Sequence, residues 1–172
     1  RSYPSGGHGR RELGDADVSE TRQPSPRNAA GWSIRRYERE DLREVGEIFR
    51  RGIAGFHWYN RTLLTTKHLR ASLEEGTAWV ATEPRAGVVG FITLYERESY
   101  IHYLFIAEDW KFCGIATGLL AIARARIGTP LELKVDAQNK HGRAFYTRLG
   151  WRETGERGGD EDRVKWLRLR SP

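Results

Sequence analysis

The sequence IAEDWKFCGIATGLL, residues 106–120, passes from an apolar segment through a glycine-containing turn into an amphipathic segment. It predicts a strand, a turn and a helix that begins near Gly114. The first turn of a helix has backbone N–H groups without partners and the positive end of the helix dipole, so a pyrophosphate can bind there. Gly114 and Ala116 leave that backbone accessible. The same pattern also fits an ordinary connection between a strand and a helix, so a second signal is needed to choose between them.

Periodic segments on both sides of this stretch predict alternating strands and helices. Strands are predicted at residues 32–37, 77–82, 88–95, 100–106, 131–135, 151–156 and 164–169. Helices are predicted at residues 66–75, 114–127 and 140–149, together with one that Asp41 caps and that carries Leu42, Val45, Ile48 and Phe49. Residues 52–66 are predicted to form a loop between two helices. This order indicates one mixed sheet with helices on both faces.

Composition places the chain among ordinary globular proteins. Its 172 residues suit one domain, and hydrophobic residues at 38% with charged residues at 30% are typical values. No apolar run approaches the roughly 20 residues of a membrane helix, and residues 1–30 lack the apolar segment of a signal peptide. Cys113 is the single cysteine, so an intrachain disulfide is excluded. These features favour a cytoplasmic protein that does not contact a membrane.

The N-terminal stretch and the net charge indicate a disordered segment and the kind of ligand that the protein binds. Residues 1–30 combine Ser, Gly, Pro and mixed charges with few large apolar side chains, which predicts a disordered arm. The formal net charge of +6 comes mostly from arginines interspersed with acidic residues. Since the basic residues do not form a run, an anionic small ligand is favoured over nucleic acid as the partner.

A second motif lies downstream, where a predicted strand ends near Asn139 and the following helix carries Tyr146 seven residues later, before Gly150 and Trp151. Asn is a good helix N-cap, and a Tyr at this position also suits a half-buried site on an amphipathic helix. The two motifs, in this order and at this separation, resemble the GNAT superfamily of acetyl-CoA-dependent N-acetyltransferases. The resemblance covers the chain from about residue 32 to its end. It implies a single GNAT domain over residues 31–172, with an α/β fold of mixed α+β character whose mostly antiparallel sheet has about seven strands and about four flanking helices.

The resemblance also implies acetyl-CoA as co-substrate, with no metal. The family's CoA signature runs Arg or Gln, two residues of any kind, Gly, any residue, then Gly or Ala, and Lys111, Gly114 and Ala116 occupy those positions. Phe112 stands where the family commonly has a small residue. The implied cofactor-binding residues are Leu104, Phe105, Ile106, Lys111, Phe112, Cys113, Gly114, Ile115, Ala116, Thr117 and Asn139. The first three act through backbone N–H groups on a strand that splays from its neighbour.

Candidate proton-transfer groups follow from the same comparison and from strand periodicity. Tyr146 is implied to be the general acid that reprotonates the departing thiolate. Alternation along the strand near residues 100–106 puts Glu98, Tyr100 and His102 on one face, and Ile101, Tyr103 and Phe105 on the other. His102 is the first candidate for the general base because imidazole titrates near neutrality, and Glu98 is the second. A solvent-facing histidine without a catalytic role fits the pattern equally well.

Three functions remain open from the sequence. The first is acetyl transfer to a primary amine of a small molecule or peptide, and the second is a non-catalytic acyl-CoA-binding domain. The third is transfer to a nucleic-acid-linked amine such as charged tRNA. By resemblance, the acceptor site involves residues 56–61 and 155–163, and a homodimer is compatible with the family.

Overall fold

A seven-stranded sheet forms the centre of the protein, with the strand order β1-β2-β3-β4-β5-β7-β6. The computed structural model describes residues 31–56, 66–159 and 165–172, so the arm predicted at residues 1–30 lies outside the described residues. The strands are β1 (Ser33–Arg36), β2 (Thr77–Glu83), β3 (Gly87–Tyr95), β4 (Tyr100–Ile106), β5 (Glu132–Asp136), β6 (Arg152–Gly159) and β7 (Lys165–Arg170). All neighbouring strands are antiparallel except β4 and β5, which run parallel. The predicted mixed, mostly antiparallel sheet is confirmed.

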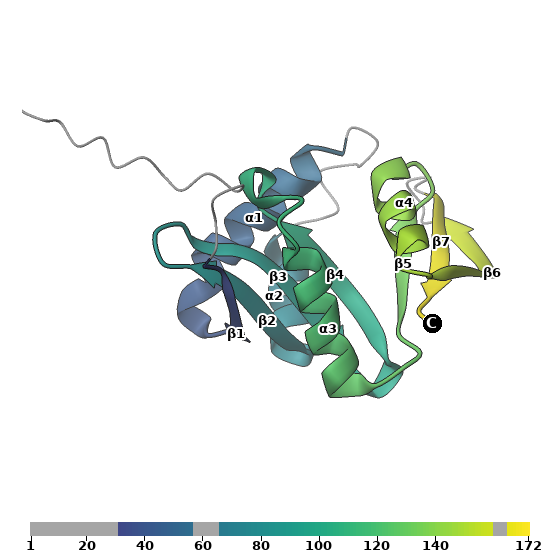
Figure 1. The fold of residues 1–172 in the computed structure, drawn as a ribbon, viewed down its shortest axis with the longest axis horizontal. Coiled ribbons are helices and arrows are strands. Elements are labelled where there is room, and N and C mark those ends of the chain that lie inside the picture. Colours follow the sequence, from purple (N-terminus) through teal and green to yellow (C-terminus); the bar gives the residue numbers. More distant parts are fainter. Residues whose placement is uncertain (1–30, 57–65, 160–164) are drawn as a thin grey trace, which may run out of the picture.

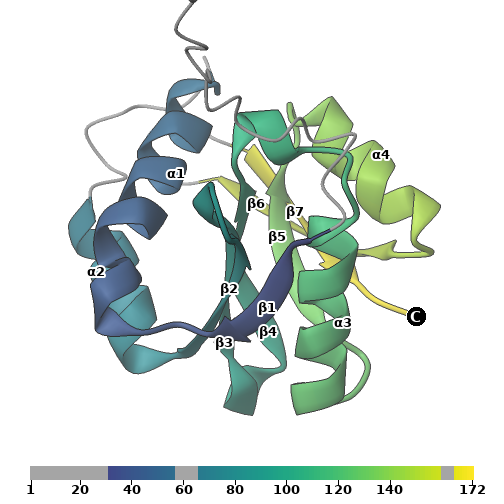
Figure 2. The same ribbon diagram turned by 60° about the vertical axis from the view of Figure 1, so that its left-hand side comes forward.

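Four helices cover the two faces of this sheet. Helices α1 (Leu42–Ala54) and α2 (Thr66–Glu75) lie on one face, and α3 (Ile115–Ile127) and α4 (Lys140–Arg148) lie on the other (Figure 2). Within the described ranges, no helix is both long enough and apolar enough to cross a membrane. The predicted number and order of helices are confirmed.

Each layer of helices buries its own apolar cluster against the sheet. On one side, Val45 and Phe49 of α1 and Leu69 of α2 are almost completely buried and pack with Val80 and Phe91. The predicted spacing in α1 therefore produces a buried helix face.

On the other side, Ile115 and Leu119 of α3 pack with Tyr146 of α4 and with the sheet residues Ile92 and Leu133. β3 has buried residues on both of its faces because both clusters meet it. The sheet is therefore the shared wall of two cores, and α3 and α4 lie together on the side of the second core.

Two local predictions about the first helix are wrong. Helix α1 continues to Ala54, so Gly52 lies inside the helix and not in a loop. A side chain at Gly52 would clash with the ring of Phe105, so this glycine lets α1 approach β4. Residues 57–65 of the predicted loop lie outside the described residues.

Asp41 does not cap α1 with its side chain. Its carboxylate instead accepts two hydrogen bonds from the Arg35 guanidinium, at 2.7 and 2.8 Å, and one from the Glu38 backbone N–H at 2.8 Å. These contacts belong to the short 3-10 helix Arg39–Asp41 that precedes α1. They tie the end of β1 to the start of α1, and the bonds from Arg35 lower the pKa of Asp41.

The Asp41 contacts generate a stability prediction. Asp41→Asn removes a buried charge that Arg35 stabilises, so it should lower the free energy of unfolding at pH 7 by about 1–2 kcal/mol. Because the folded pKa is lowered, the contribution of Asp41 is present above its unfolded pKa of ~3.9 and is lost as pH falls through the folded value. Urea unfolding between pH 7 and pH 3 should show a constant difference that shrinks below about pH 4.

The control is Glu47→Gln, which removes exposed ion pairs with Arg50 and Arg51 and should change stability little. A difference between wild type and Asp41→Asn that persists undiminished at pH 3 would contradict this account.

Candidate active site

Strands β4 and β5 meet at one end and then separate. Their register has a single pair, Tyr100↔Glu132, and the Glu132 N–H donates to the Ser99 carbonyl at 2.9 Å. On its other edge, β4 pairs with β3 along its whole length, from Tyr95↔Tyr100 to Gly90↔Ile106. Figure 1 shows the two strands diverging from their common end, with α3 beside β4 and α4 beside β5. Among the residues that the structure describes, the far half of β4 therefore has one edge without a partner strand.

The direction of each N–H group on β4 follows from two hydrogen bonds. The Tyr103 N–H donates to Thr93 Oγ1 at 3.0 Å and the Ala107 N–H donates to the Val89 carbonyl at 2.9 Å, and both acceptors belong to β3. Because successive N–H groups of a strand alternate in direction, those of Leu104 and Ile106 point to the unpaired edge. Phe105 was predicted to offer its N–H there as well, but alternation directs that group towards β3.

The turn before α3 has the features of an anion site. Gly114 is the N-cap of α3 with a φ of +81°, which favours glycine, and no side chain caps the helix. The first turn contains no acidic residue, and the Gly118 N–H is bonded to the Gly114 carbonyl at 3.0 Å. The preceding N–H groups of Ile115, Ala116 and Thr117 belong to the helix end that lacks intrahelical acceptors. These groups can hold a pyrophosphate without help from a charged side chain.

Two predicted cofactor residues in this turn have unusual settings. Lys111 is in an ion pair with Glu108 at 2.6 Å, so part of its charge is already neutralised. Phe112 has a φ of +64° and is 97% exposed. A left-handed conformation costs a residue other than glycine roughly 1–2 kcal/mol. The turn therefore carries backbone strain at the position where the family commonly has a small residue.

Trp32, which is 81 residues away from Cys113 in the sequence, is hydrogen-bonded to this turn. Its indole Nε1–H donates to the Cys113 carbonyl at 3.1 Å. A side chain at Gly118 would come within 2.8 Å of the Trp32 ring, so the glycine in α3 makes room for the indole. The sequence alone places Trp32 in the first strand and gives it no role in the site. A glycine inside a helical pattern was the one available signal of close packing there.

On α4, the two predicted residues lie where the sequence placed them. Asn139 is the N-cap, and its Oδ1 accepts a hydrogen bond from the Gly142 N–H at 2.9 Å, which confirms the predicted cap. Tyr146 is buried between the rings of Phe145 and Trp151, with centroid distances of 5.1 and 5.2 Å. Burial raises the pKa of its phenol, and no hydrogen bond from the described residues contributes to the shift. The phenol therefore keeps its proton well into the alkaline range and can act as a donor.

A β-bulge in β4 changes the predicted strand faces. Thr93 pairs with Tyr103 and the next residue, Leu94, pairs with Ile101, so His102 is an extra residue on β4. The rings of His102 and Tyr103 stack at 4.0 Å between centroids, on the side of α1 and α2. Ile101 packs instead in the cluster of α3. The prediction that Ile101 and Tyr103 share a face opposite His102 is wrong, because alternation fails where the bulge adds a residue.

Glu98 is also misplaced in the sequence-based prediction. It lies in the 3-10 helix Glu96–Glu98, before β4 begins, and it is exposed. Ser99 follows with a φ of +51°, which turns the chain into the strand. Glu98 therefore does not continue the face of β4 that carries His102.

His102 occupies a half-buried, polar position. Its Nδ1 lies 2.8 Å from the hydroxyl oxygen of Ser72 on α2. Burial lowers the pKa of its imidazole, and electrostatic interactions with His68 and Lys134 lower it further. The imidazole is consequently neutral at pH 7 and has a lone pair that can accept a proton.

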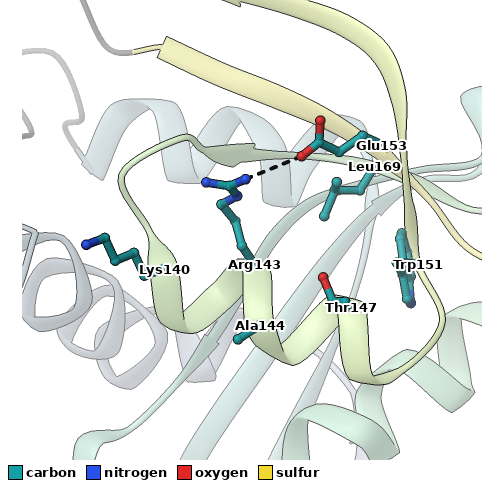
Figure 3. Close-up of a pocket in the computed structure, with 7 residues that line it drawn as sticks. All are labelled: Lys140, Arg143, Ala144, Thr147, Trp151, Glu153 and Leu169. Atoms are coloured by element: carbon teal, nitrogen blue, oxygen red, sulfur yellow. Dashed lines mark hydrogen bonds and ion pairs between the residues drawn. The ribbon is translucent and has the colours of Figure 1, made fainter.

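A shallow hollow of about 230 Å³ lies elsewhere, between α4 and the strands β6 and β7 (Figure 3). Its lining residues are Lys140, Arg143, Ala144, Thr147, Trp151, Glu153 and Leu169. Arg143 and Glu153 form an ion pair across it at 3.4 Å. It includes neither the turn before α3 nor His102, so it is separate from the site described above. Within the described part of the chain, no three His, Cys, Asp or Glu side chains gather in a way that could hold a metal ion.

Comparisons with known proteins agree with this arrangement. The acetyltransferase (GNAT) domain family matches residues 41–170. The peptidyl-lysine N-acetyltransferase YjaB of Escherichia coli (strain K12) is 30% identical over 132 residues, covering 75% of this chain and 88% of the relative. The solution structure of apo YjaB from Escherichia coli superposes with a TM-score of 0.68 at 28% identity, covering 81% of this chain and 97% of the other.

A more distant structure shows the same fold. The ribosomal-protein-S18-alanine N-acetyltransferase from Escherichia coli has a TM-score of 0.64 at 20% identity, with 82% of this chain and 93% of the other covered. The family match covers most of the chain and includes both sequence motifs, the diverging strands and the open helix end. This chain belongs to the GNAT family and is an N-acetyltransferase, an acyltransferase that acetylates an amine.

Proposed function

We propose that this protein transfers the acetyl group of acetyl-CoA directly to the side-chain amine of a lysine in a peptide or protein. The observation that carries the proposal is the unpaired edge of β4, which begins beyond the single Tyr100↔Glu132 pair and ends near the open N-terminus of α3. Support for the acceptor comes from the relative at 30% identity, which is a peptidyl-lysine N-acetyltransferase. An extended thioester cofactor and a flexible amine can meet at such a gap from opposite faces of the sheet.

The backbone provides the proposed cofactor contacts. The N–H groups at the start of α3, at Ile115, Ala116 and Thr117, hold the pyrophosphate. The N–H groups of Leu104 and Ile106 bind the arm that carries the thioester, because they point to the unpaired edge of β4. Fixed N–H donors of this kind also stabilise negative charge that develops on a carbonyl oxygen. When bound, acetyl-CoA supplies the electrophilic thioester.

In this proposal one side chain accepts a proton from the acceptor amine, and another donates a proton to the leaving thiolate. The acceptor amine of lysine has a reference pKa near ~10.4, so it arrives protonated at pH 7 and must lose a proton. His102 accepts that proton, because its lowered pKa keeps it neutral. Tyr146 returns a proton to the leaving thiolate, because burial keeps its phenol protonated.

The acceptor class is tested with two matched peptides. One carries a single lysine and an acetylated N-terminus, and the other carries arginine in place of lysine and a free N-terminus. Incubation with acetyl-CoA should release CoA thiol only with the lysine peptide, and mass spectrometry should place the new acetyl group on its side chain. Acetylation of the free N-terminus alone would contradict the lysine proposal, as would the absence of product with both peptides.

Gly114→Glu tests the phosphate site. The substitution puts a carboxylate at the open end of α3 and forces a larger side chain into a left-handed conformation. Acetyl-CoA at about 100 times its Kd should stabilise the wild type by roughly 2.7 kcal/mol, seen as a raised Tm, and the variant should lose this shift.

The matched control is Gly128→Glu at the other end of α3. Gly128 has a similar φ of +89°, and no neighbouring atom lies within 4 Å of the position that a Cβ would take there. This variant carries the same charge change at the opposite end of the helix, at a backbone position (φ +89°, ψ −163°) that also favours glycine, so it should keep the full ligand-induced shift in Tm. An equal loss in both variants would mean that strain in α3, not the anion site, is responsible.

Tyr146→Phe tests the proton donor. Removing the hydroxyl should lower kcat by about 10²-fold, the usual contribution of a general acid, with little change in KM for acetyl-CoA. The loss should be smaller at low pH, where solvent protonates the thiolate more readily. Tyr37→Phe, which removes a phenol from the cluster beside α1, is the control and should leave kcat unchanged. A kcat close to that of the wild type in Tyr146→Phe would reduce Tyr146 to a packing role.

A further inference from the structure

Two buried hydroxyl groups lie directly behind the bulge in β4. Ser72 on α2 and Thr93 on β3 are almost completely removed from solvent. The Ser72 hydroxyl donates to Thr93 Oγ1 at 3.0 Å, and the Ser72 oxygen lies 2.8 Å from His102 Nδ1. A chain of three side chains therefore links the sheet interior to the imidazole.

The bulge explains why Thr93 stands at this point. At a bulge the extra residue disrupts the ladder, so a neighbouring backbone N–H can lose its carbonyl acceptor. The Tyr103 N–H donates here to the Thr93 side chain at 3.0 Å. Thr93 Oγ1 thus receives two donors, one from the strand backbone and one from Ser72. A hydrocarbon side chain of the same shape would leave the Tyr103 N–H without this acceptor and would free the Ser72 hydroxyl to turn towards His102.

This arrangement points to one nitrogen of His102 as the one that carries the proton. With the Ser72 hydrogen directed to Thr93, the Ser72 oxygen is left to accept from His102, and Nδ1 is then the donor. A neutral imidazole has one N–H group, so Nε2 then holds the lone pair. We propose that Ser72 and Thr93 are positioning residues that hold His102 as the Nδ1–H tautomer and thereby leave Nε2 to accept the proton of the acceptor amine.

The inference rests on the proposed function, in which His102 is the base. In the proposed step the proton moves from the amine nitrogen to Nε2, whose lone pair forms the new N–H bond. The neutral amine nitrogen then forms the bond to the carbonyl carbon, the C–S bond breaks with its electrons on sulfur, and the nitrogen loses a second proton to water as the amide forms. Tyr146 protonates the sulfur, and its phenolate regains a proton from water, so the one proton gained overall stays on His102. A free imidazole would populate both tautomers. If His102 is held in the Nδ1–H form, every neutral ring has its Nε2 lone pair available to accept the proton of the amine.

Other groups around His102 set its charge but not its tautomer. His68 on α2 and Lys134 on β5 are the positively charged or ionisable groups that act on it. Tyr95 on β3 and Tyr100 and Tyr103 on β4 surround the ring, with centroid distances of 5.2, 6.5 and 4.0 Å. Within the described ranges, the contact with Ser72 is the hydrogen bond that distinguishes one ring nitrogen of His102 from the other.

The first test is a long-range ¹H–¹⁵N correlation spectrum of His102 in the full protein, which reports the tautomer without any activity measurement. The wild type should show the Nδ1–H form. Ser72→Ala removes the acceptor, and the ring should shift towards Nε2–H. Thr93→Val should do the same with Ser72 still in place, because the Ser72 hydroxyl is then released to donate to Nδ1. Thr93→Ser keeps a hydroxyl and should retain the wild-type tautomer.

The second test is the pH dependence of kcat/KM in the same variants. Ser72→Ala and Thr93→Val should lose on the order of 10-fold in kcat/KM for the acceptor at pH 7, a fraction of what general base catalysis contributes, with KM for acetyl-CoA unchanged. Thr93→Ser should restore the wild-type profile. Ser171→Ala is the control, because it removes a different buried hydroxyl, which accepts from the Leu131 N–H at 2.9 Å. It should lower Tm without altering the tautomer or the profile.

The outcomes separate this inference from the proposed function. An Nε2–H tautomer in the wild type, or an unchanged tautomer in Thr93→Val, would overturn the positioning role whatever the activity. An Nδ1–H tautomer that shifts as expected while kcat/KM stays at the wild-type value would overturn it as well. With His102 as the base, kcat/KM of the wild type should rise with pH as the imidazole loses its proton. If kcat/KM of His102→Ala still rises in the same way, His102 is not the base, and the proposed function fails at that residue independently of the tautomer.

Discussion

The separation of β4 from β5 is the constraint on which the rest of the structure depends. In a continuous sheet the inner edge of β4 would be bonded to its neighbour, and its N–H groups would have no capacity for a ligand. Here the two strands share one register pair and then diverge, and α3 and α4 stand on the two sides of the gap (Figure 1). The cost of leaving N–H groups without strand partners makes such an edge rare unless something binds there. In the proposed function, an extended cofactor in the gap would satisfy those groups as a missing strand would.

The bulge at His102 works together with this gap. It lies in the part of β4 just after the Tyr100↔Glu132 pair, where the strand begins to leave β5. A bulge bends a strand and increases its twist, so the extra residue fits a strand that must turn away from its neighbour. The same residue carries the candidate base. In the proposed mechanism, the divergence of β4 from β5 and the proton transfer at His102 would therefore both depend on this bulge, where the Tyr103 N–H is bonded to Thr93.

Sequence reasoning found the parts of the site that depend on local chain geometry. Gly114 needs a left-handed backbone, Asn139 caps a helix, and Tyr146 faces the core at helical spacing; each of these follows from residues within one or two turns. The periodic runs likewise placed the four helices and seven strands found in the described part of the chain. The end of α1 was predicted wrongly because Gly52 does not end the helix. It is a glycine because a side chain there would clash with the ring of Phe105, which is far away in the sequence.

The parts that sequence reasoning missed depend on contacts between distant segments. A bulge has no signature in the residues of β4, since YIHYLFI alternates as well in one register as in the next. Glu98 was assigned to a strand face by the same assumption of unbroken alternation. The contact of Ser72 with His102, 30 residues away, appears only when α2 is docked on the sheet.

The contact between Trp32 and the turn before α3 couples two regions that are 81 residues apart in the sequence. Trp32 directly precedes β1, which is a short strand at the edge of the sheet and pairs only with β2. Edge strands of this kind open locally at lower free-energy cost than the rest of a sheet. Each opening of β1 that carries the indole away removes a hydrogen bond from the turn, and any ligand that orders the turn makes that opening rarer. By thermodynamic linkage the two effects have the same size. If the turn before α3 holds the pyrophosphate as proposed, opening of β1 and binding at the turn are coupled through Trp32, so backbone amide exchange in β1 would report on binding at a site 81 residues away in the sequence.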